Sequence, residues 1–167
     1  MKGKAVYPGT FDPITLGHLD VIKRGVKLFD GLVIAVAQNP YKKPLFNASE
    51  RKKLVEQSVK GIKGVKVRVF DGLLVDFAKK EKANVILRGL REMSDFPLEF
   101  QQALVNRKMA PNIETVFVMT NESHFYLSSS LVKEIAMYGG RLDDFVPKPV
   151  EKALKEKYEG MRKNKSK

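Results

Sequence analysis

The sequence predicts a single doubly wound α/β domain whose five-stranded parallel sheet has the strand order 3-2-1-4-5. Short apolar runs alternate with helical patterns along the whole chain, which is typical of repeated β-α-β units. Several of these runs are almost continuously apolar, as expected for parallel strands that are buried on both faces. The 167 residues suit one core that buries roughly 70% of the surface of the unfolded chain. We therefore expect one domain over residues 1–160 and a basic, flexible tail at residues 161–167.

The first strand, a tight loop and the first helix are predicted from residues 5–29. The strand is the apolar run Ala5–Tyr7, and the helix over Gly17–Phe29 follows from apolar residues at helical spacing (Leu19, Ile22, Val26 and Phe29). Between them lies Y-P-G-T-F-D-P-I-T-L-G-H, residues 7–18, whose prolines and glycines favour turns.

The later strands are predicted from short apolar or alternating runs, and the later helices from apolar residues at helical spacing. Nearly continuous apolar runs predict central strands at Leu32–Ala37, Asn84–Leu87 and Thr115–Met119. Valines that alternate with basic residues predict an edge strand over Val65–Val69. The helices are expected at Ala48–Val59 (capped by Asn47 and Glu50), Leu73–Lys80, Pro97–Met109, Ser129–Tyr138 and Pro149–Tyr158.

The predicted strand order places a crevice between strands 1 and 4, whose connections leave in opposite directions. The loop after strand 1 carries Thr10–His18, and the loop after strand 4 carries Arg88-Gly89-Leu90-Arg91. One loop therefore supplies a helix N-terminus, which binds phosphate well, and the other supplies two guanidinium groups. An arginine pair at a strand end is more often a solvated salt-bridge donor, but the crevice favours a binding role.

The tetrad T-x-G-H, Thr15–His18, is the strongest candidate for chemistry. Gly17 removes a side chain where a ligand can come close, and the imidazole of His18 can touch a reacting phosphoryl group. Taken alone, a histidine in a first helical turn is more often a cap or a solvated residue. The twelve-residue segment around the tetrad is what makes the signal specific.

Two further segments fit the same crevice. In the Pro-bounded loop after strand 2, Lys42 can meet a phosphate, whereas Lys43 is interpreted as a surface charge. Ser128–Ser130 follow strand 5 and open a helix, so their hydroxyl and N–H groups can bind outer phosphates; N-capping explains one of the three. Ser130–Lys133 also matches S-x-x-K, but the chain has neither S-D-N nor K-T-G, so that match is set aside.

Composition excludes several classes of protein. The absence of cysteine rules out disulfides, thiolate nucleophiles and Cys-ligated metals. No apolar run is long enough to span a membrane and the first residues do not resemble a signal peptide, so we expect a soluble, cytoplasmic protein. The net charge of +12 includes +5 from eight basic and three acidic residues after Pro147. The remaining excess suits any polyanion, but the sequence lacks the motifs of specific RNA binding.

These segments closely resemble the phosphopantetheine adenylyltransferase family, within the nucleotidyltransferases that carry a T/HxGH motif. The resemblance covers nearly the whole chain. It is carried by P-G-T-F-D-P in the first loop, K-K-P-L-F at residues 42–46, R-G-L-R at 88–91, Asp95-Phe96 with Glu99, and S-S-S-L-V-K-E at 128–134.

The resemblance implies a Rossmann-like nucleotidyltransferase fold and transfer of the adenylyl group from ATP to 4′-phosphopantetheine, giving dephospho-coenzyme A and pyrophosphate. It also implies Mg²⁺ with ATP, a homohexamer and coenzyme A as a feedback inhibitor, without a protein metal site, a specific nucleic acid or a membrane partner. The catalytic residues implied are His18 (transition-state stabiliser), Lys42 and Arg91. Those implied for the acceptor are Thr10, Lys42, Leu74 and Arg88. Those implied for ATP are Thr10, Phe11, His18, Gly89, Leu90, Arg91, Glu99, His124, Phe125, Tyr126, Leu127, Ser128, Ser129 and Ser130.

The residues allow direct displacement at the α-phosphorus, because the acceptor phosphate is itself the nucleophile. Pro97-Leu98 and His124–Tyr126 depart from the family pattern where aromatic residues are common. Two alternatives stay open: an adenylyltransferase for another phosphorylated acceptor such as nicotinamide mononucleotide, and a basic RNA-binding module without catalysis. K-K-P-L-F and R-G-L-R argue against the first.

Overall fold

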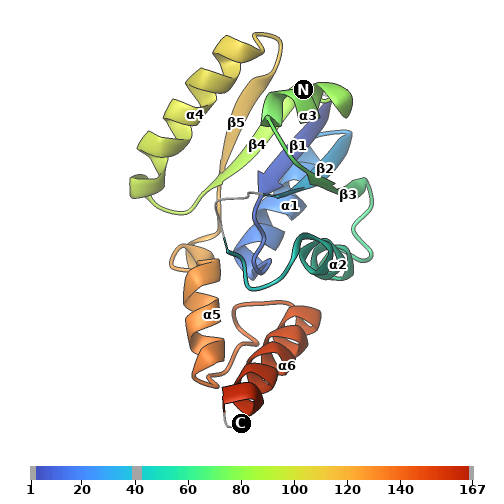
Figure 1. Cartoon of the computed structure of the whole chain (residues 1–167). Helices are drawn as coiled ribbons and strands as arrows, with labels where there is room; N and C mark the ends of the chain where they lie inside the picture. Colours follow the sequence, from blue (N-terminus) through green and yellow to red (C-terminus); the bar gives the residue numbers. More distant parts are fainter. Residues whose placement is uncertain (1–2, 39–42, 166–167) are drawn as a thin grey trace.

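The computed structural model describes residues 3–38 and 43–165. Within them, five strands form one parallel sheet in the order β3-β2-β1-β4-β5, which confirms the predicted topology (Figure 1). The strands are β1 (Lys4–Gly9), β2 (Gly31–Ala37), β3 (Val65–Phe70), β4 (Val85–Leu90) and β5 (Glu114–Met119). The α-helices are α1 (Leu16–Leu28), α2 (Ala48–Ser58), α3 (Leu74–Lys80), α4 (Phe96–Met109), α5 (Ser129–Met137) and α6 (Lys148–Lys165), with 3-10 turns η1 (Met93–Asp95) and η2 (Glu122–His124).

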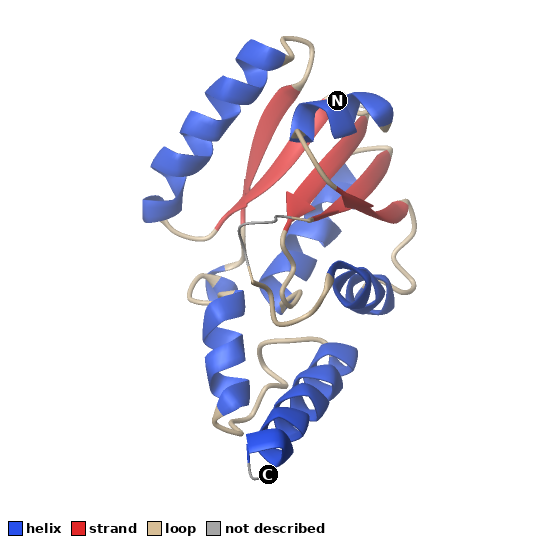
Figure 2. Ribbon diagram, in the orientation of Figure 1, coloured by secondary structure: helices blue, strands red, loops and turns tan. Residues whose placement is uncertain are grey.

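Strand β1 lies at the centre of the sheet, where Ala5 pairs with Leu32 of β2 and with Val85 of β4. Because neighbouring residues of a strand point to opposite faces, β1 contributes to two cores. Ala5 and Tyr7 pack in the larger core with residues of α1, α2, α5 and α6, whereas Val6 packs in the smaller core with residues of α3. Helices therefore cover the sheet on both sides (Figure 2).

Helix α2 begins where the sequence predicts, at a reciprocal cap. The Oδ1 atom of Asn47 accepts a hydrogen bond from the backbone N–H of Glu50 at 2.9 Å, and Glu50 Oε2 accepts from the N–H of Asn47 at 2.7 Å. These bonds satisfy donors that the first helical turn leaves free. The cap fixes the end of the β2–α2 loop, which borders the site described below.

Strand β5 is the clearest departure from the predicted elements. Its place at the edge of the sheet agrees with the predicted order 3-2-1-4-5, but its continuous apolar pattern predicts burial on both faces, and its residues are only partly buried or exposed. Helix α4 lies beside it (Figure 1) and contains no buried residue. Large apolar side chains stay exposed on α4, including Leu98 and Leu104, and Met119 at the end of β5 is 60% exposed. The apolar pattern of β5 therefore reflects a face that this chain by itself leaves uncovered.

Helix α6 is longer than predicted. It continues to Lys165, beyond the expected end at Tyr158, and Figure 1 shows it beside α5, beyond the carboxyl ends of the strands. The assignment of residues 161–167 to a flexible tail stays a prediction. In the described ranges, every helix is too short or too polar to cross a membrane.

Candidate active site

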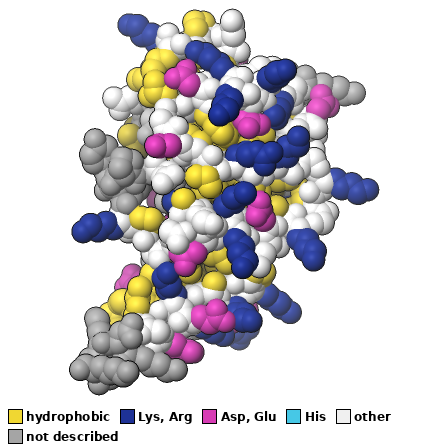
Figure 3. Space-filling model, turned by 45° about the vertical axis from the view of Figure 1, so that its right-hand side comes forward, with side chains coloured by type: hydrophobic (Ala, Val, Ile, Leu, Met, Phe, Trp, Pro, Cys, Tyr) yellow, Lys and Arg dark blue, Asp and Glu magenta, His cyan; other side chains and the backbone are white. Residues whose placement is uncertain are grey.

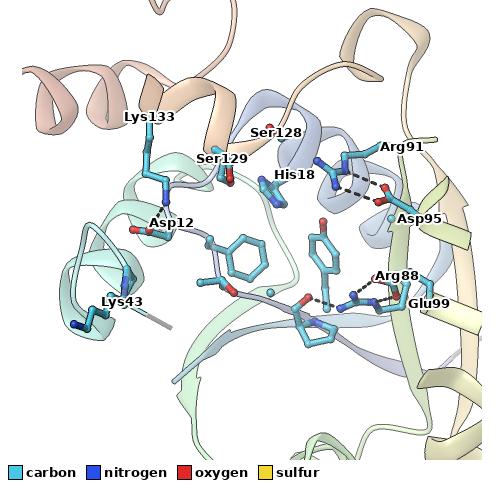
Figure 4. Close-up of a pocket in the computed structure, with 18 residues that line it drawn as sticks. Asp12, His18, Lys43, Arg88, Arg91, Asp95, Glu99, Ser128, Ser129 and Lys133 are labelled. Atoms are coloured by element: carbon cyan, nitrogen blue, oxygen red, sulfur yellow. Dashed lines mark hydrogen bonds and ion pairs between the residues drawn. The ribbon is translucent and has the colours of Figure 1, made fainter. Parts of the chain in front are cut away.

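A cavity of about 610 Å³ opens at the carboxyl ends of β1 and β4, where the strand order predicts a crevice. Figure 4 shows its side chains converging from the β1–α1 loop, the end of β4, the start of α4 and the start of α5. The lining residues are Tyr7, Pro8, Gly9, Thr10, Phe11, Asp12, His18, Lys43, Pro44, Arg88, Gly89, Arg91, Asp95, Glu99, Ser128, Ser129, Ser130 and Lys133.

His18 is held in the first turn of α1 by a reciprocal cap with Thr15. Its Nδ1 atom accepts a hydrogen bond from the backbone N–H of Thr15 at 3.0 Å and lies 2.8 Å from Thr15 Oγ1. The side chain of Thr15 in turn accepts from the N–H of His18 at 3.4 Å. Because Nδ1 accepts a backbone N–H, the neutral imidazole carries its proton on Nε2. The cap therefore leaves one N–H donor on the far side of the ring.

The surroundings of His18 favour its neutral form. Burial, with smaller contributions from the positive charges of Arg91 and Arg88, lowers the pKa of His18 to about 4. The Phe11 ring lies edge-on at 5.1 Å from the imidazole and is itself buried. Phe11 has a φ of 49°, a left-handed conformation that is costly for a residue with a side chain. This backbone conformation accompanies the packing of its ring between His18 and Tyr7.

We expect this pKa shift to make the ligand-free protein sensitive to acid. Because the pKa of His18 is about 4 in the folded chain and about 6.5 in the unfolded chain, protonation favours unfolding as the pH falls from 6.5 towards 4. Between pH 7 and pH 5 this single group should lower the free energy of unfolding by about 2 kcal/mol. Urea unfolding at both pH values measures the change.

The His18→Asn variant is the control for that measurement, because its carbonyl can accept the Thr15 N–H while the side chain does not titrate. The acid-induced loss of stability should be smaller in the variant by the same amount. Equal losses in the two proteins would show that the pKa of His18 is not lowered by folding.

Arg88 and Arg91 each face a carboxylate of the α4 region. The guanidinium of Arg88 donates to both carboxylate oxygens of Glu99, and its Nη1 donates to the carbonyl of Pro8 at 3.1 Å. Arg91 donates to Asp95 at 3.2 and 3.3 Å. These pairs hold both guanidinium groups at the cavity wall, where each still has N–H groups that can turn to a phosphate.

The start of α5 forms the opposite wall. Ser128 caps the helix by accepting from the N–H of Leu131 at 3.1 Å, and the Ser129 hydroxyl donates to the carbonyl of Pro13 at 2.8 Å. Capping therefore explains one serine, as predicted, and Ser129 ties the helix to the loop of His18. The helix N-terminus faces the cavity with its partial positive charge, which favours an anion.

A smaller cavity of about 60 Å³ lies behind His18. It is lined by Tyr7, Thr15, Gly17, His18, Val21, Gly89, Arg91, Thr120 and Leu127. A Cβ atom added at Gly89 would lie 2.7 Å from Val21 Cγ2, so β4 and α1 approach each other too closely for a side chain here. At Gly17 a Cβ would meet His124 Cβ at 3.6 Å, an ordinary contact, so protein packing does not demand this glycine.

The structure brings together most of the residues that the sequence singles out. Thr10, Phe11, His18, Arg88, Gly89, Arg91, Glu99 and Ser128–Ser130 line the main cavity, and Leu127 lines the smaller one. Leu74, Leu90, His124, Phe125 and Tyr126 line neither; Leu74 packs beside the smaller core, and Tyr126 is 62% exposed. Lys42 lies outside the described residues.

No site role is predicted from the sequence for four charged residues that line the cavity: Asp12, Lys43, Asp95 and Lys133. Lys43 is interpreted there as a surface charge, and Lys133 belongs to the S-x-x-K match that is set aside. The signal for Lys133 was its helical spacing, because a residue four positions after Ser129 shares its helix face. Asp12 and Asp95 belong to segments that carry the family resemblance, P-G-T-F-D-P and Asp95-Phe96, but those segments gave no role for either side chain.

The chain resembles characterised proteins over most of its length. Residues 6–135 match a family model described as cytidylyltransferase-like. A protein named phosphopantetheine adenylyltransferase from Caldanaerobacter subterraneus subsp. tengcongensis is 56% identical over 154 residues, which cover 92% of this chain and 96% of that protein. A protein of the same name from Thermodesulfovibrio yellowstonii is 55% identical over 159 residues, covering 95% and 99%.

A solved structure, described as a candidate nicotinate-nucleotide adenylyltransferase from Vibrio parahaemolyticus, has the same fold, with a TM-score of 0.63 over 92% of this chain and 91% of that one. At 19% identity this likeness concerns the fold alone. The sequence matches are far closer and span both proteins almost completely. The chain is a nucleotidyltransferase and belongs to the phosphopantetheine adenylyltransferase family.

Proposed function

We propose that this chain transfers the adenylyl group of ATP to 4′-phosphopantetheine, giving dephospho-coenzyme A and pyrophosphate, the penultimate step of coenzyme A biosynthesis. The observation that carries the proposal is the placement of a neutral imidazole, His18, beside Arg88 and Arg91 in one cavity. These three donors, with a helix N-terminus opposite, suit two phosphorylated substrates that repel each other. Family membership supplies the identity of the acceptor.

The reaction needs no covalent enzyme intermediate and no general base. An oxygen of the acceptor phosphate attacks the α-phosphorus of ATP, while the bond from that phosphorus to the oxygen bridging to the β-phosphate breaks. The electron pair of that bond leaves with pyrophosphate. The protein has two tasks: to align the nucleophile with the phosphorus and to stabilise charge on the transferring and leaving oxygens.

Each task has a proposed group in the cavity. His18 donates its Nε2–H to an α-phosphate oxygen, and Arg88 holds the acceptor phosphate. Arg91 and the N-terminus of α5 at Ser128–Ser130 steady the leaving pyrophosphate. Lys42, which lies outside the described residues, is proposed beside Arg88 on the resemblance alone.

The remaining proposed contacts follow from matching positions in the family. Thr10 and Leu74 contact the acceptor. Contacts to ATP come from Thr10, Phe11, Gly89, Leu90, Glu99, His124, Phe125, Tyr126 and Leu127. For the residues that line neither cavity, the proposal requires the ligand to extend beyond the two cavities.

Magnesium is proposed to enter with ATP. Among the described residues no three His, Cys, Asp or Glu side chains gather as a metal site. The three cavity carboxylates, Asp12, Asp95 and Glu99, already accept hydrogen bonds from Lys133, Arg91 and Arg88. Phosphate oxygens and water are the ligands that Mg²⁺ prefers in nucleotide sites, so the residues fit an ion carried by the nucleotide. When bound, the ion neutralises part of the triphosphate charge.

The test is incubation with ATP, Mg²⁺ and 4′-phosphopantetheine, with the product identified by its mass. We expect dephospho-coenzyme A, and no dinucleotide when nicotinamide mononucleotide replaces the acceptor. A dinucleotide in place of dephospho-coenzyme A would support the alternative acceptor.

The RNA-binding alternative has its own test. It would be supported by an affinity for RNA that depends steeply on salt and that ATP does not affect. In Figure 3 the Lys and Arg side chains are spread over the visible face, not gathered into one stripe.

We also propose that the chain forms a homohexamer and works in the cytoplasm, with coenzyme A competing for the cavity. The support for assembly is the exposed apolar surface of α4 and β5, because monomers rarely expose large contiguous apolar patches. This surface includes Phe96, Leu98, Phe100, Leu104, Val105, Met109 and Met119, each between 38% and 60% exposed.

The proposed competition of coenzyme A for the cavity can be tested by inhibition. Inhibition by coenzyme A that is relieved by added 4′-phosphopantetheine would support it.

We expect Leu104→Glu to break the assembly. The side chain is 52% exposed in the single chain, so the substitution should change the stability of the isolated protomer by less than about 0.5 kcal/mol. In a subunit interface, however, a buried and unpaired carboxylate is strongly unfavourable. Sedimentation velocity should show a smaller species for Leu104→Glu. Leu28→Glu, at an exposed leucine of α1, should keep the wild-type mass; an unchanged mass in both variants would place the interface elsewhere.

A further inference from the structure

Two charged side chains are buried in the described part of the chain, and the proposed reaction uses neither of them. Asp12 is 5% exposed and Arg51 is 2% exposed. Burying a charge is costly unless other groups satisfy it. Asp12 lies in the β1–α1 loop, and Arg51 lies in the first turn of α2. The groups that bind Asp12 and Arg51 show which parts of the structure these two side chains hold in place.

Arg51 binds backbone carbonyls from three separate segments. Its Nε donates to Phe46 O at 3.0 Å, and its Nη1 donates to Thr10 O at 2.5 Å and Ala37 O at 2.9 Å. These carbonyls lie before α2, after β1 and at the end of β2. Burial lowers the pKa of Arg51, and the negative charge of Asp12 opposes that change. The rigid fork of a guanidinium can join three such oxygens, which the single ammonium of lysine cannot reproduce.

Asp12 holds the same loop from the other side. Its carboxylate accepts the N–H of Leu45 and the N–H of Phe46, each at 2.9 Å. The Nζ of Lys133 donates to the same carboxylate at 2.9 Å, which links α5 to this point. The backbone of Phe46 is therefore fixed at both ends, its N–H by Asp12 and its C=O by Arg51. Its ring is also buried.

The fixed segment directly follows Lys43 and Pro44, which line the cavity. Arg51 does not line the cavity, and its carbonyl partner Thr10 does. Two parts of the cavity wall, Thr10 and Lys43-Pro44, thus depend on one buried guanidinium for their relative position. Figure 4 shows Lys43 and Asp12 on the side of the cavity away from Arg91.

We propose that Arg51, together with Asp12, is a positioning residue for the acceptor. It sets the spacing between the Thr10 loop and the cavity wall at Lys43-Pro44, and this spacing determines where the acceptor phosphate binds. This inference rests on the proposed function. Arg51 lines neither cavity, and the segment that it and Asp12 hold closely follows Lys42 in the sequence, which is proposed for the acceptor and not for ATP. The steady-state constants for the two substrates should therefore respond unequally when Arg51 is replaced.

The test is Arg51→Lys, which keeps the charge and removes the fork. We expect the KM for the acceptor to rise about tenfold or more, because displacement of positioning groups typically has effects of this size. The KM for ATP should change less than about threefold. The matched control is Arg68→Lys, because Arg68 is exposed and donates only to the neighbouring carbonyl of Val67 among its described contacts. That variant should behave as wild type.

A readout that needs no substrate separates this inference from the proposed function. In Arg51→Lys, hydrogen exchange at residues 43–47 should become faster, while exchange in β1 stays unchanged. If the wild-type protein makes no dephospho-coenzyme A but exchange at residues 43–47 is faster in Arg51→Lys, the proposed function is refuted and the role of Arg51 in positioning this loop remains. Equal increases of both KM values, uniformly faster exchange, or wild-type behaviour would overturn the positioning role.

If Arg51→Lys does not fold, Asp12→Asn decides by the same criteria. Its amide keeps the shape of the carboxylate but places an N–H donor against one of the two backbone N–H groups, of Leu45 or Phe46, from which Asp12 now accepts hydrogen bonds. Thermal unfolding monitored by circular dichroism identifies which variants are folded. A folded Asp12→Asn protein with equal changes in both KM values would also reject the proposal.

Discussion

Replacing His18 by Ala is expected to lower kcat by about 10² to 10³-fold, with the affinity for ATP changed less than about threefold. The imidazole is neutral at pH 7 because its pKa is held near 4, and the Thr15 N–H fixes its remaining proton on Nε2. Such a donor contributes most when charge builds on the α-phosphate oxygens in the transition state. Rapid-quench kinetics gives the rate of transfer, and equilibrium titration gives the dissociation constant of ATP.

Two further substitutions separate the donor from the helix cap. The side-chain carbonyl of His18→Asn can still accept the Thr15 N–H but does not reach as far as Nε2, so turnover should be lost as in His18→Ala. His18→Gln carries an N–H group near the position of Nε2 and should retain more turnover than either. If His18→Asn were as active as wild type, the capping role alone would explain the histidine.

The fold could be predicted from the sequence because apolar residues form short continuous or alternating runs in the strands and recur at helical spacing in the helices. Asn47 and Glu50 even predict the cap that the structure contains. The place of β5 in the sheet was predicted correctly, but its burial was not, because a continuous apolar run does not distinguish a strand covered by its own chain from one left uncovered at an edge.

The candidate site was predictable where a residue lies at the carboxyl end of β1 or β4. His18 lies in the first turn of α1, and Arg91 directly follows β4; Arg88, expected in the loop after that strand, lies within it because β4 continues to Leu90. Asp12 and Lys43 also lie on loops next to the crevice, but the partners of Asp12 could not be predicted, because Leu45, Phe46 and Lys133 reach it from distant segments. Arg51 did carry a signal. It lies three and four residues before Leu54 and Val55, which are buried in α2, so helical spacing places it on the apolar face. A charged residue on such a face requires buried partners.

Replacing Arg88 by Met should lower kcat/KM for the acceptor by about 10² to 10³-fold. Two effects act in the same direction. The acceptor phosphate loses a bidentate donor, and Glu99, which is bonded to Arg88 through both carboxylate oxygens, is left as an unpaired negative charge beside it. The measurement is the dependence of the initial rate on acceptor concentration at saturating ATP. Arg107→Met, which breaks the exposed pair of Arg107 with Glu114, should leave the kinetics unchanged.

The double variant Arg88→Met/Glu99→Gln separates those two effects. If repulsion from the orphaned carboxylate accounts for part of the loss, removal of its charge should restore about tenfold of kcat/KM, since like charges near one site disfavour each other strongly. Glu99→Gln alone should have a smaller effect than Arg88→Met, because Arg88 keeps its charge and its bond to Pro8 O. A double variant no more active than Arg88→Met would show that Glu99 serves only to orient the guanidinium, and that direct contact with Arg88 accounts for the whole loss.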